Sequence, residues 1–391
     1  MNKLLIISIL QISTGTVFCQ SDPFKIKFTY EIETGIADGS IKPSRAGTLY
    51  SFIGEYYRAA TYSDIPVSWG IDTLSVDTYN LQSALPYIIE EAKAHQIVII
   101  SENHLKPQHR VFAKKIIEEL ATQGFRHLGL ETFVHLNNST KLVDSNLIQR
   151  GYPLDSPLSG TYTMESKMGD LIRTALKSGY KPFAYEESAK VDGRDRDEVQ
   201  ADNIIKYLDS NPGARIVIFC GFHHAIESDM IKRRSSNWMA KYLKDKTGVD
   251  PLTIYQDNFT EKFVENEHPC LNQLNVAVPS VFTDSRGKII KFSENVDIEI
   301  IHPITTYRNG RPDWMYEEGE FKSVPIKIDR NSTIFPVIVS ASISGEEDGV
   351  PLDRVEIRYP YDQKVLALRK GEYIIRIFDG EGYTEYRETV N

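Results

Sequence analysis

The chain has 391 residues, of which 41% are hydrophobic and 25% are charged. These proportions exclude a disordered chain, a collagen-like chain and a coiled-coil rod. The formal net charge is −9, without a long block of one sign. Because clustered Lys and Arg supply most of the affinity for phosphate backbones, we expect no nucleic-acid partner. A chain of this length favours two domains over one.

Residues 1–20 have the features of a secretory signal peptide. Lys3 precedes a short apolar run, and the segment ends in weakly polar, small residues with Cys19 and Gln20. The run is far shorter than the ~20 residues that a bilayer-spanning helix needs, and no later segment is long enough, so we expect no membrane span. The ending resembles signal ends common in Gram-negative bacteria of the Bacteroidota type. This predicts export to the periplasm or the extracellular space.

Two cysteines remain after the predicted cleavage, Cys220 and Cys270. An oxidising compartment permits one disulfide between them. Cys220 lies in an apolar strand-like run, which favours a buried free thiol.

Residues 21–78 are predicted to form an N-terminal extension that packs on the domain after it. Residues 25–33 alternate like a short strand, and residues 46–60 have helical spacing.

From residue 79 to 272, short apolar strands alternate with amphipathic helices. The predicted strands are 97–100, 125–130, 182–185, 215–220 and 252–255, and the predicted helices are 81–94, 107–123, 164–178, 196–208 and 228–246. Strands that are apolar on both faces are typical of a parallel sheet covered on both sides. The predicted fold class is therefore α/β, with a mainly parallel sheet flanked by helices.

Beyond residue 275 the helical patterns stop. Strand-like runs separated by turns follow at 276–282, 289–292, 298–301, 334–343, 355–358, 365–368 and 372–378. They predict a small C-terminal all-β, sandwich-like domain over residues 275–391. Such a domain could provide a surface or protein contact.

Polar side chains able to bind a metal or move a proton follow every predicted strand of the α/β domain. They lie in the segments 101–104 (Ser-Glu-Asn-His), 131–132 (Glu-Thr), 186–187 (Glu-Glu), 221–224 (Gly-Phe-His-His) and 256–257 (Gln-Asp). Ligands of open parallel sheets bind beyond the carboxyl ends of the strands. We therefore expect His104, Glu131 and His224 to converge on one ion or one substrate carbonyl.

The residue types leave the chemistry open. Zn, Mn or Co would each fit a ligand set of two histidines and one or two carboxylates; that set is Glu102, His104, Glu131 and His224. His223 and His224 point to opposite sides if extended, so we expect at most one of them to enter the site. Arg196, which opens a predicted helix, is interpreted as an anion clamp or oxyanion stabiliser, or else as a surface ion-pair partner.

Four of these segments, in this order, resemble the motifs of the superfamily that joins ChaN-like haem-uptake, erythromycin-esterase-like and Tiki/TraB proteins. They are 101–104, 130–133 (Leu-Glu-Thr-Phe), 196–203 and 221–224, and the resemblance covers about residues 80–258. It implies that His224, not His223, enters the site. A single residue separates Glu102 from His104, and this spacing favours the ChaN-like branch over the erythromycin-esterase branch. The sequence departs from the superfamily pattern at Ser101 and Gln200, where Gly and Met are usual.

The superfamily includes metal-dependent peptidases, hydrolases said to work without a metal, and haem-binding proteins, so two hypotheses stand. The first is a secreted hydrolase of ester or amide bonds with a small-molecule or peptide substrate. In it the carboxylates and histidines hold a divalent cation or provide a general base, and Arg196 stabilises the oxyanion. The second is a haem-binding protein in which His104, His223 or His224, or else an exposed tyrosine, binds the iron. A weaker third is a docking protein whose site has decayed.

Overall fold

The computed structural model describes residues 26–63, 79–135, 140–186, 194–229, 236–262, 274, 276–292 and 295–391. The predicted signal peptide and Cys270 lie outside these residues.

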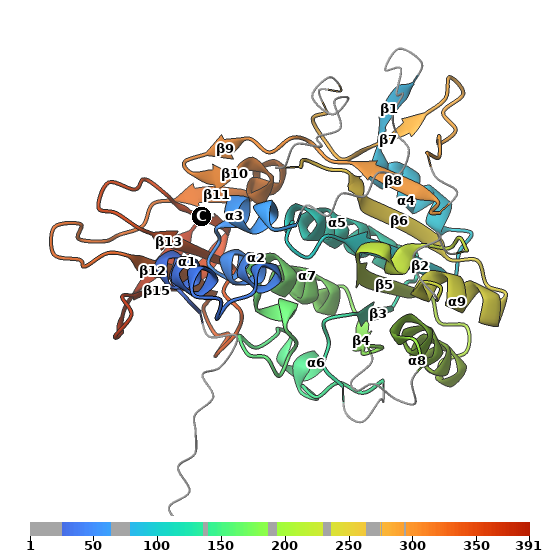
Figure 1. Cartoon of the computed structure of the whole chain (residues 1–391), viewed down its shortest axis with the longest axis horizontal. Coiled ribbons are helices and arrows are strands. Elements are labelled where there is room, and N and C mark those ends of the chain that lie inside the picture. Colours follow the sequence, from blue (N-terminus) through green and yellow to red (C-terminus); the bar gives the residue numbers. More distant parts are fainter. Residues whose placement is uncertain are drawn as a thin grey trace, which may run out of the picture.

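The largest sheet has eight strands in the order β1-β7-β8-β6-β2-β5-β3-β4 (Figure 1). Its strands are β1 (Asn80–Ser83), β2 (Ile97–Glu102), β3 (His127–Leu130), β4 (Lys181–Phe183), β5 (Ile216–Gly221), β6 (Leu252–Phe259), β7 (Ser280–Thr283) and β8 (Ile298–Ile301). Pairing is parallel from β8 to β4, and β7 is antiparallel to both β8 and β1. The predicted α/β class with a mainly parallel sheet is confirmed.

Helices cover both faces of this sheet because alternate residues of its strands point to opposite sides. Val98 and Ile100 of β2 lie in one apolar cluster with α4 (Ala84–Ala92), α5 (Gln108–Thr122) and α7 (Ser166–Lys177). Ile97 and Ile99 lie in another with α8 (Arg196–Ser210) and α9 (Met239–Thr247). Among the described residues, this part also contains α6 (Leu147–Arg150) and the 3₁₀ helices η2 (Tyr162–Met164) and η3 (Phe222–Ala225).

The strand predicted at residues 25–33 is wrong: the segment enters helix α1 (Thr29–Ala37). Phe28 and Ile32 are both buried and four residues apart, which places them on one helix face, and the Glu31 side chain accepts a hydrogen bond from the Phe28 backbone N–H at 2.7 Å. The single helix predicted at residues 46–60 is two, α2 (Pro43–Phe52) and α3 (Tyr56–Thr61). They are separated at Gly54, which has φ +70° and leaves no room for a Cβ beside the Arg354 carbonyl.

The C-terminal part is antiparallel and all-β, as predicted, but it begins later than residue 275. β7 and β8 belong to the large sheet, because the buried strand β8 pairs with β6. Strand patterns do not specify which sheet a strand joins. The module consists of β9 (Tyr307–Arg308), β10 (Arg311–Pro312), η4 (Asp313–Gly319), β11 (Phe321–Val324), β12 (Val337–Ile343), β13 (Asp353–Ile357), β14 (Leu366–Arg369), β15 (Gly371–Phe378) and β16 (Tyr383–Val390).

The pair β11-β14 and the four-stranded sheet β13-β12-β15-β16 contribute to one apolar core. β16 was not among the predicted strands, because its side chains are mostly exposed and polar. The run predicted at 289–292 forms only an isolated bridge, at Ile289.

The N-terminal helices pack against this β module. Thr29 donates to the Glu356 carboxylate from its backbone N–H at 2.8 Å and from its hydroxyl. Glu55 pairs with Arg358 at 2.8 Å and also with Lys364. The extension contacts the α/β part as well, where the Tyr56 hydroxyl donates to Glu165 at 3.1 Å.

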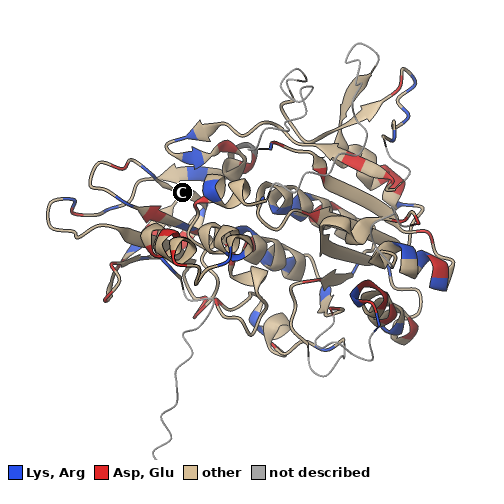
Figure 2. Cartoon of the chain, in the orientation of Figure 1, with Lys and Arg blue, Asp and Glu red and all other residues tan. Residues whose placement is uncertain are grey.

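Acidic and basic residues are interspersed over the elements, as α8 and α9 show (Figure 2). Lys246 of α9, for example, pairs with Glu198 and Asp202 of α8 at 2.9 and 2.7 Å. Among the described residues, none of the helices combines the length and apolar character needed to span a bilayer.

Candidate active site

The predicted site residues meet at the carboxyl ends of three neighbouring strands, β2, β5 and β3. Glu102 is the last residue of β2, Glu131 directly follows β3, and His224 lies in η3 after β5. Arg196 is the first residue of α8. The loops and helix starts beyond these strands thus bring together side chains that are far apart in sequence.

His104 is held by a buried ion pair. Its Nδ1 lies 2.8 Å from Glu102 Oε1, and Glu102 also accepts two hydrogen bonds from Arg110, at 2.7 and 2.9 Å. Burial raises the pKa of Glu102, but Arg110 and His104 outweigh burial and hold this pKa below its ordinary value. Because the ionised carboxylate accepts the Nδ1 proton, the Nε2 lone pair of His104 is available to another group.

Aromatic rings fix the plane of His104. Tyr162 stacks on it with ring centroids 4.2 Å apart and an interplanar angle of 15°, and Phe222 meets it edge-on at 5.2 Å. Phe222 has φ +40°, a strained conformation for a bulky residue. Strain of this kind persists only where the surrounding structure imposes it, here beside His104.

His224 is oriented in the same way by a different carboxylate. Its Nδ1 is hydrogen-bonded to Oδ1 of Asp197, a buried side chain that also accepts from the Met239 backbone N–H at 3.0 Å. Burial lowers the pKa of His224, but Glu131 and Asp197 outweigh burial and raise this pKa above its ordinary value. The fold therefore favours the protonated ring.

Glu131 lies between the two histidines. Its Oε2 is 4.0 Å from His104 Nε2, and its Oε1 is 3.6 Å from His224 Nε2. Burial opposes ionisation, but the two histidines, Arg196 and the Gly221 N–H lower the pKa of Glu131 to about 2. Gly221 permits this close arrangement, because a Cβ there would lie 2.3 Å from His104 Nε2.

Arg196 is the most exposed member of the site, with 46% of its side chain accessible. It donates to Glu131 at 2.6 Å and to Glu186, and its Nη1 lies 3.2 Å from His224 Nε2. Gln200, one of the two residues that differ from the motifs of the similar superfamily, donates to Glu186 at 2.9 Å. Arg196 thus offers a positive charge to solvent while buried or partly buried acids fix its position.

As arranged, the predicted metal ligands do not fit a metal ion. Within the described part of the chain, no group of three or more His, Cys, Asp or Glu could hold one. The Glu102 oxygens accept from Arg110, and the Glu131 oxygens accept from Arg196 and from the Gly221 N–H. Each of these carboxylates therefore already accepts hydrogen bonds from protein donors.

His223 does not join these groups. Its ring lies against Trp238 at 5.1 Å and Tyr255 at 6.3 Å. Cys220, at the end of β5, is a buried free thiol whose pKa is raised by burial.

Sequence reasoning missed Arg110 and Tyr162 and gave Asp197 no role in the site. Arg110 could have been suspected, because it lies among apolar residues on the buried stripe of a helix that begins just after His104. Asp197 is not the cap: Asp195 is, and it accepts from the Asp197 N–H at 3.0 Å.

No family model and no curated protein matches the chain. Among the solved structures that are similar at low TM-score are a type III effector and a toxin effector domain. The type III effector HopBA1 is 12% identical with a TM-score of 0.31, over 48% of this chain and 92% of that chain. RRSP, a MARTX toxin effector domain from Vibrio vulnificus CMCP6, is 16% identical with a TM-score of 0.30, over 58% of this chain and 47% of that chain. The resemblance to the ChaN-like superfamily stays a prediction.

Proposed function

We propose that this chain is an exported hydrolase of ester or amide bonds that works by acid–base catalysis. One observation carries the proposal. Two histidines, each with Nδ1 held by a buried carboxylate, place Nε2 within 4.0 Å of the same Glu131, next to the exposed Arg196. Carboxylate-oriented histidines beside a cation are the parts that acyl transfer to water requires.

The two histidines take different roles. His104 is the general base: its Nε2 accepts a proton from the water that attacks the carbonyl carbon. His224 is the general acid: Glu131 and Asp197 raise the pKa of its ring above the ordinary value, and the protonated ring gives its proton to the leaving oxygen or nitrogen. His104 then releases its proton to solvent and His224 takes one up, which restores the starting state.

Arg196 and Glu131 contribute to the reaction through their charges. Arg196 is accessible to substrate and stabilises the oxyanion of the tetrahedral intermediate. A carboxylate with a pKa of about 2 is a poor base at neutral pH, so Glu131 acts by positioning Arg196 and by favouring the protonated form of His224. The substrate is a small ester or amide or a peptide, because Arg196, with 46% of its side chain accessible, can meet the carbonyl oxygen of any of them.

The test uses the mature protein with a panel of p-nitrophenyl esters and peptide p-nitroanilides. We expect turnover that survives EDTA and that falls by about 100-fold or more in His104→Asn and Glu131→Gln, the scale of a lost acid–base group. His127→Asn is the matched control, because His127 lies at the opposite end of β3 and contacts Tyr207 at 2.8 Å. Unchanged rates in both site variants, or no turnover of any compound, would contradict the proposal.

Elemental analysis and an absorption spectrum with haemin cover the alternatives. If the purified protein contains a stoichiometric metal and the His104→Asn variant does not, the result would favour a metal-dependent mechanism over metal-free acid–base catalysis. A Soret band that is lost on substitution of His104, His223 or His224 would favour a ChaN-like haem-binding protein instead.

A further inference from the structure

Arg110 holds both the backbone and the side chain of His104. Its Nη2 donates to the His104 carbonyl at 2.9 Å, and its Nε and Nη2 donate to Glu102, the carboxylate that orients the His104 ring. A guanidinium that makes two hydrogen bonds to one carboxylate fixes the direction of that carboxylate, because its donors form a rigid fork. The position of His104 therefore depends on the position of Arg110.

Arg110 is itself held by a second carboxylate, that of Glu165. Its Nη1 donates to Glu165 Oε2 at 2.9 Å, and both side chains are fully buried. Burial lowers the pKa of Arg110, but Glu102 and Glu165 outweigh burial and raise this pKa above its ordinary value. Because a buried guanidinium is stable only when it is paired, the two carboxylates together determine where Arg110 lies.

Glu165 receives donors from two separate segments of the chain. At the start of α7 its carboxylate accepts from the backbone N–H groups of Lys167 and Met168, both at 2.9 Å, and so caps the helix. Its Oε1 also accepts from the Tyr56 hydroxyl at 3.1 Å. Burial and the charge of Glu165 raise the pKa of Tyr56 well above its ordinary value, so the hydroxyl keeps its proton and remains a donor.

Tyr56 connects the N-terminal extension and the β module to this carboxylate. It is the first residue of α3, and its ring belongs to the apolar core of the β module. Trp314 packs against the ring with centroids 5.2 Å apart, and the guanidinium carbon of Arg311 lies over it, 5.8 Å from its centroid. The hydroxyl thus reaches the α/β part from a ring that two other parts of the chain hold in place.

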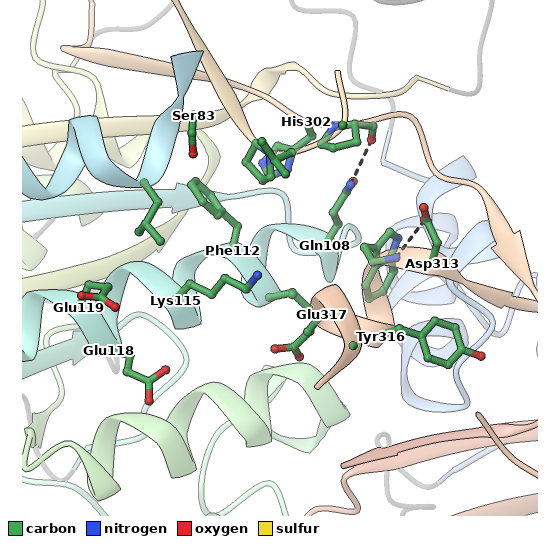
Figure 3. Close-up of a pocket in the computed structure, with 18 of the residues that line it drawn as sticks. Ser83, Gln108, Phe112, Lys115, Glu118, Glu119, His302, Asp313, Tyr316 and Glu317 are labelled. Carbon is green, nitrogen blue, oxygen red and sulfur yellow. Dashed lines mark hydrogen bonds between the residues drawn. The ribbon is translucent and has the colours of Figure 1, made fainter. Parts of the chain in front are cut away.

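The other face of α5 borders a cavity of about 790 Å³ between this helix and η4 (Figure 3). Gln108, Phe112 and Lys115 line the cavity, whereas Arg110 and Tyr56 do not. Positions 108 and 112 are about one helical turn apart, and position 110 lies midway between them, on the opposite side of the helix. The contacts that reach Glu102 therefore lie on the face of α5 that is turned away from the cavity.

We propose that Tyr56 is a positioning residue for His104, and that the hydrolytic site is complete only when the N-terminal extension has docked on the α/β part and the β module. Hydrogen bonds of 2.7 to 3.1 Å connect, in this order, Tyr56, Glu165, Arg110, Glu102 and His104. Without the hydroxyl, Glu165 has one donor fewer and attracts Arg110 more strongly, which weakens the hold of Arg110 on Glu102. The inference rests on the proposed role of His104 as the general base and adds a condition for that role.

The test compares Tyr56→Phe with the wild type by NMR of the mature protein after ¹⁵N-histidine labelling, at alkaline pH, where neutral imidazole is observed. The wild type should carry the His104 proton on Nδ1, and we expect Tyr56→Phe to show a mixture of the Nδ1 and Nε2 tautomers. With the ester that the wild type hydrolyses, kcat should fall by about tenfold at unchanged KM, because the lost hydrogen bond is one to a charged group.

Tyr180→Phe is the matched control. Tyr180 is a buried tyrosine whose hydroxyl donates to the Ile117 carbonyl of α5 at 2.8 Å, so the variant loses a comparable hydrogen bond to the same helix. Its His104 signals and its kcat should equal those of the wild type. Glu165→Gln is a second test that keeps the side-chain shape but removes the charge beside Arg110, and it should shift the His104 tautomers in the same direction. Circular dichroism checks that each variant folds.

The NMR measurement needs no substrate, so this inference and the proposed hydrolysis can fail separately. A tautomer shift in Tyr56→Phe, with a wild type that hydrolyses nothing, would support the positioning of His104 and contradict the hydrolase. Unchanged His104 signals in both Tyr56→Phe and Glu165→Gln would overturn the inference even if the wild type is active. An equal change of these signals in Tyr180→Phe would overturn it as well.

Discussion

Replacing Gly221 by alanine tests whether His104 must lie where the fold places it. Gly221 has φ −84° and ψ 145°, which alanine adopts freely, so the effect comes from the added methyl group alone. The Cβ would lie 2.3 Å from Nε2 and 2.4 Å from Cε1 of His104. Carbon contacts are optimal at roughly 3.5–4 Å, so the ring has to retreat by about 1 Å or more.

That retreat removes what orients the ring. Nδ1 leaves the Glu102 oxygen, 2.8 Å away, and the stack on Tyr162 at 4.2 Å is broken. A displacement of about 1 Å in a catalytic group costs on the order of 100-fold in rate. Overpacking costs about 1–3 kcal/mol in the free energy of unfolding, and the lower end is expected because the ring can move toward solvent.

The assay is the hydrolysis rate of whichever ester the wild type turns over, with the ring signals of His104 followed by NMR after ¹⁵N-histidine labelling. Gly382→Ala is the control, since a Cβ at Gly382 meets no heavy atom within 4 Å. We expect the rate and the His104 signals to change in Gly221→Ala only. Full activity with unchanged signals would refute the steric argument.

The other predictions concern charge. Arg110→Met leaves Glu102 charged and buried, so urea denaturation should show a loss of about 3–5 kcal/mol, and a loss under roughly 1 kcal/mol would contradict it. Because Glu131 and Asp197 raise the pKa of His224 against burial, its stabilising contribution is full below the unfolded value of about 6.5 and is lost as pH rises through the folded value. Asp197→Asn should lower the NMR titration midpoint of His224; an unchanged midpoint would be evidence against that pairing. For Glu131, burial opposes ionisation but the pKa is about 2, so its contribution is present above the unfolded value of about 4.3 and is lost as pH falls toward 2. The free energy of unfolding of Glu131→Gln should therefore fall less steeply with acid than that of the wild type. Identical acid-unfolding curves for the two proteins would count against this role of Glu131.

The large sheet could be predicted because its strands are apolar on both faces. Ile97 to Ile100 and Ile216 to Phe219 are almost fully buried, so their sequence has no polar face and the parallel arrangement follows. The rule that strand ends converge then placed His104, Glu131 and His224 together. The order of strands was not predictable, because β8 joins β6 through contacts that no local pattern contains.

The groups that position the site were harder to predict. Arg110 and Asp197 are charged residues on helices, and such residues are usually solvated. Here both are buried because each meets an opposite charge from another element, Glu102 from β2 and His224 from η3. Burial of a charge depends on its tertiary partner, so a single sequence indicates the helix but not the pairing.

The packing of the N-terminal helices on the β module has a consequence for folding. Thr29 meets Glu356 across 327 residues of chain, and Glu55 meets Arg358 across 303. During synthesis the helices must therefore wait for the whole α/β part and much of the β module before their charged partners and apolar cover exist. Contacts of such long range slow folding and leave apolar faces uncovered in the meantime.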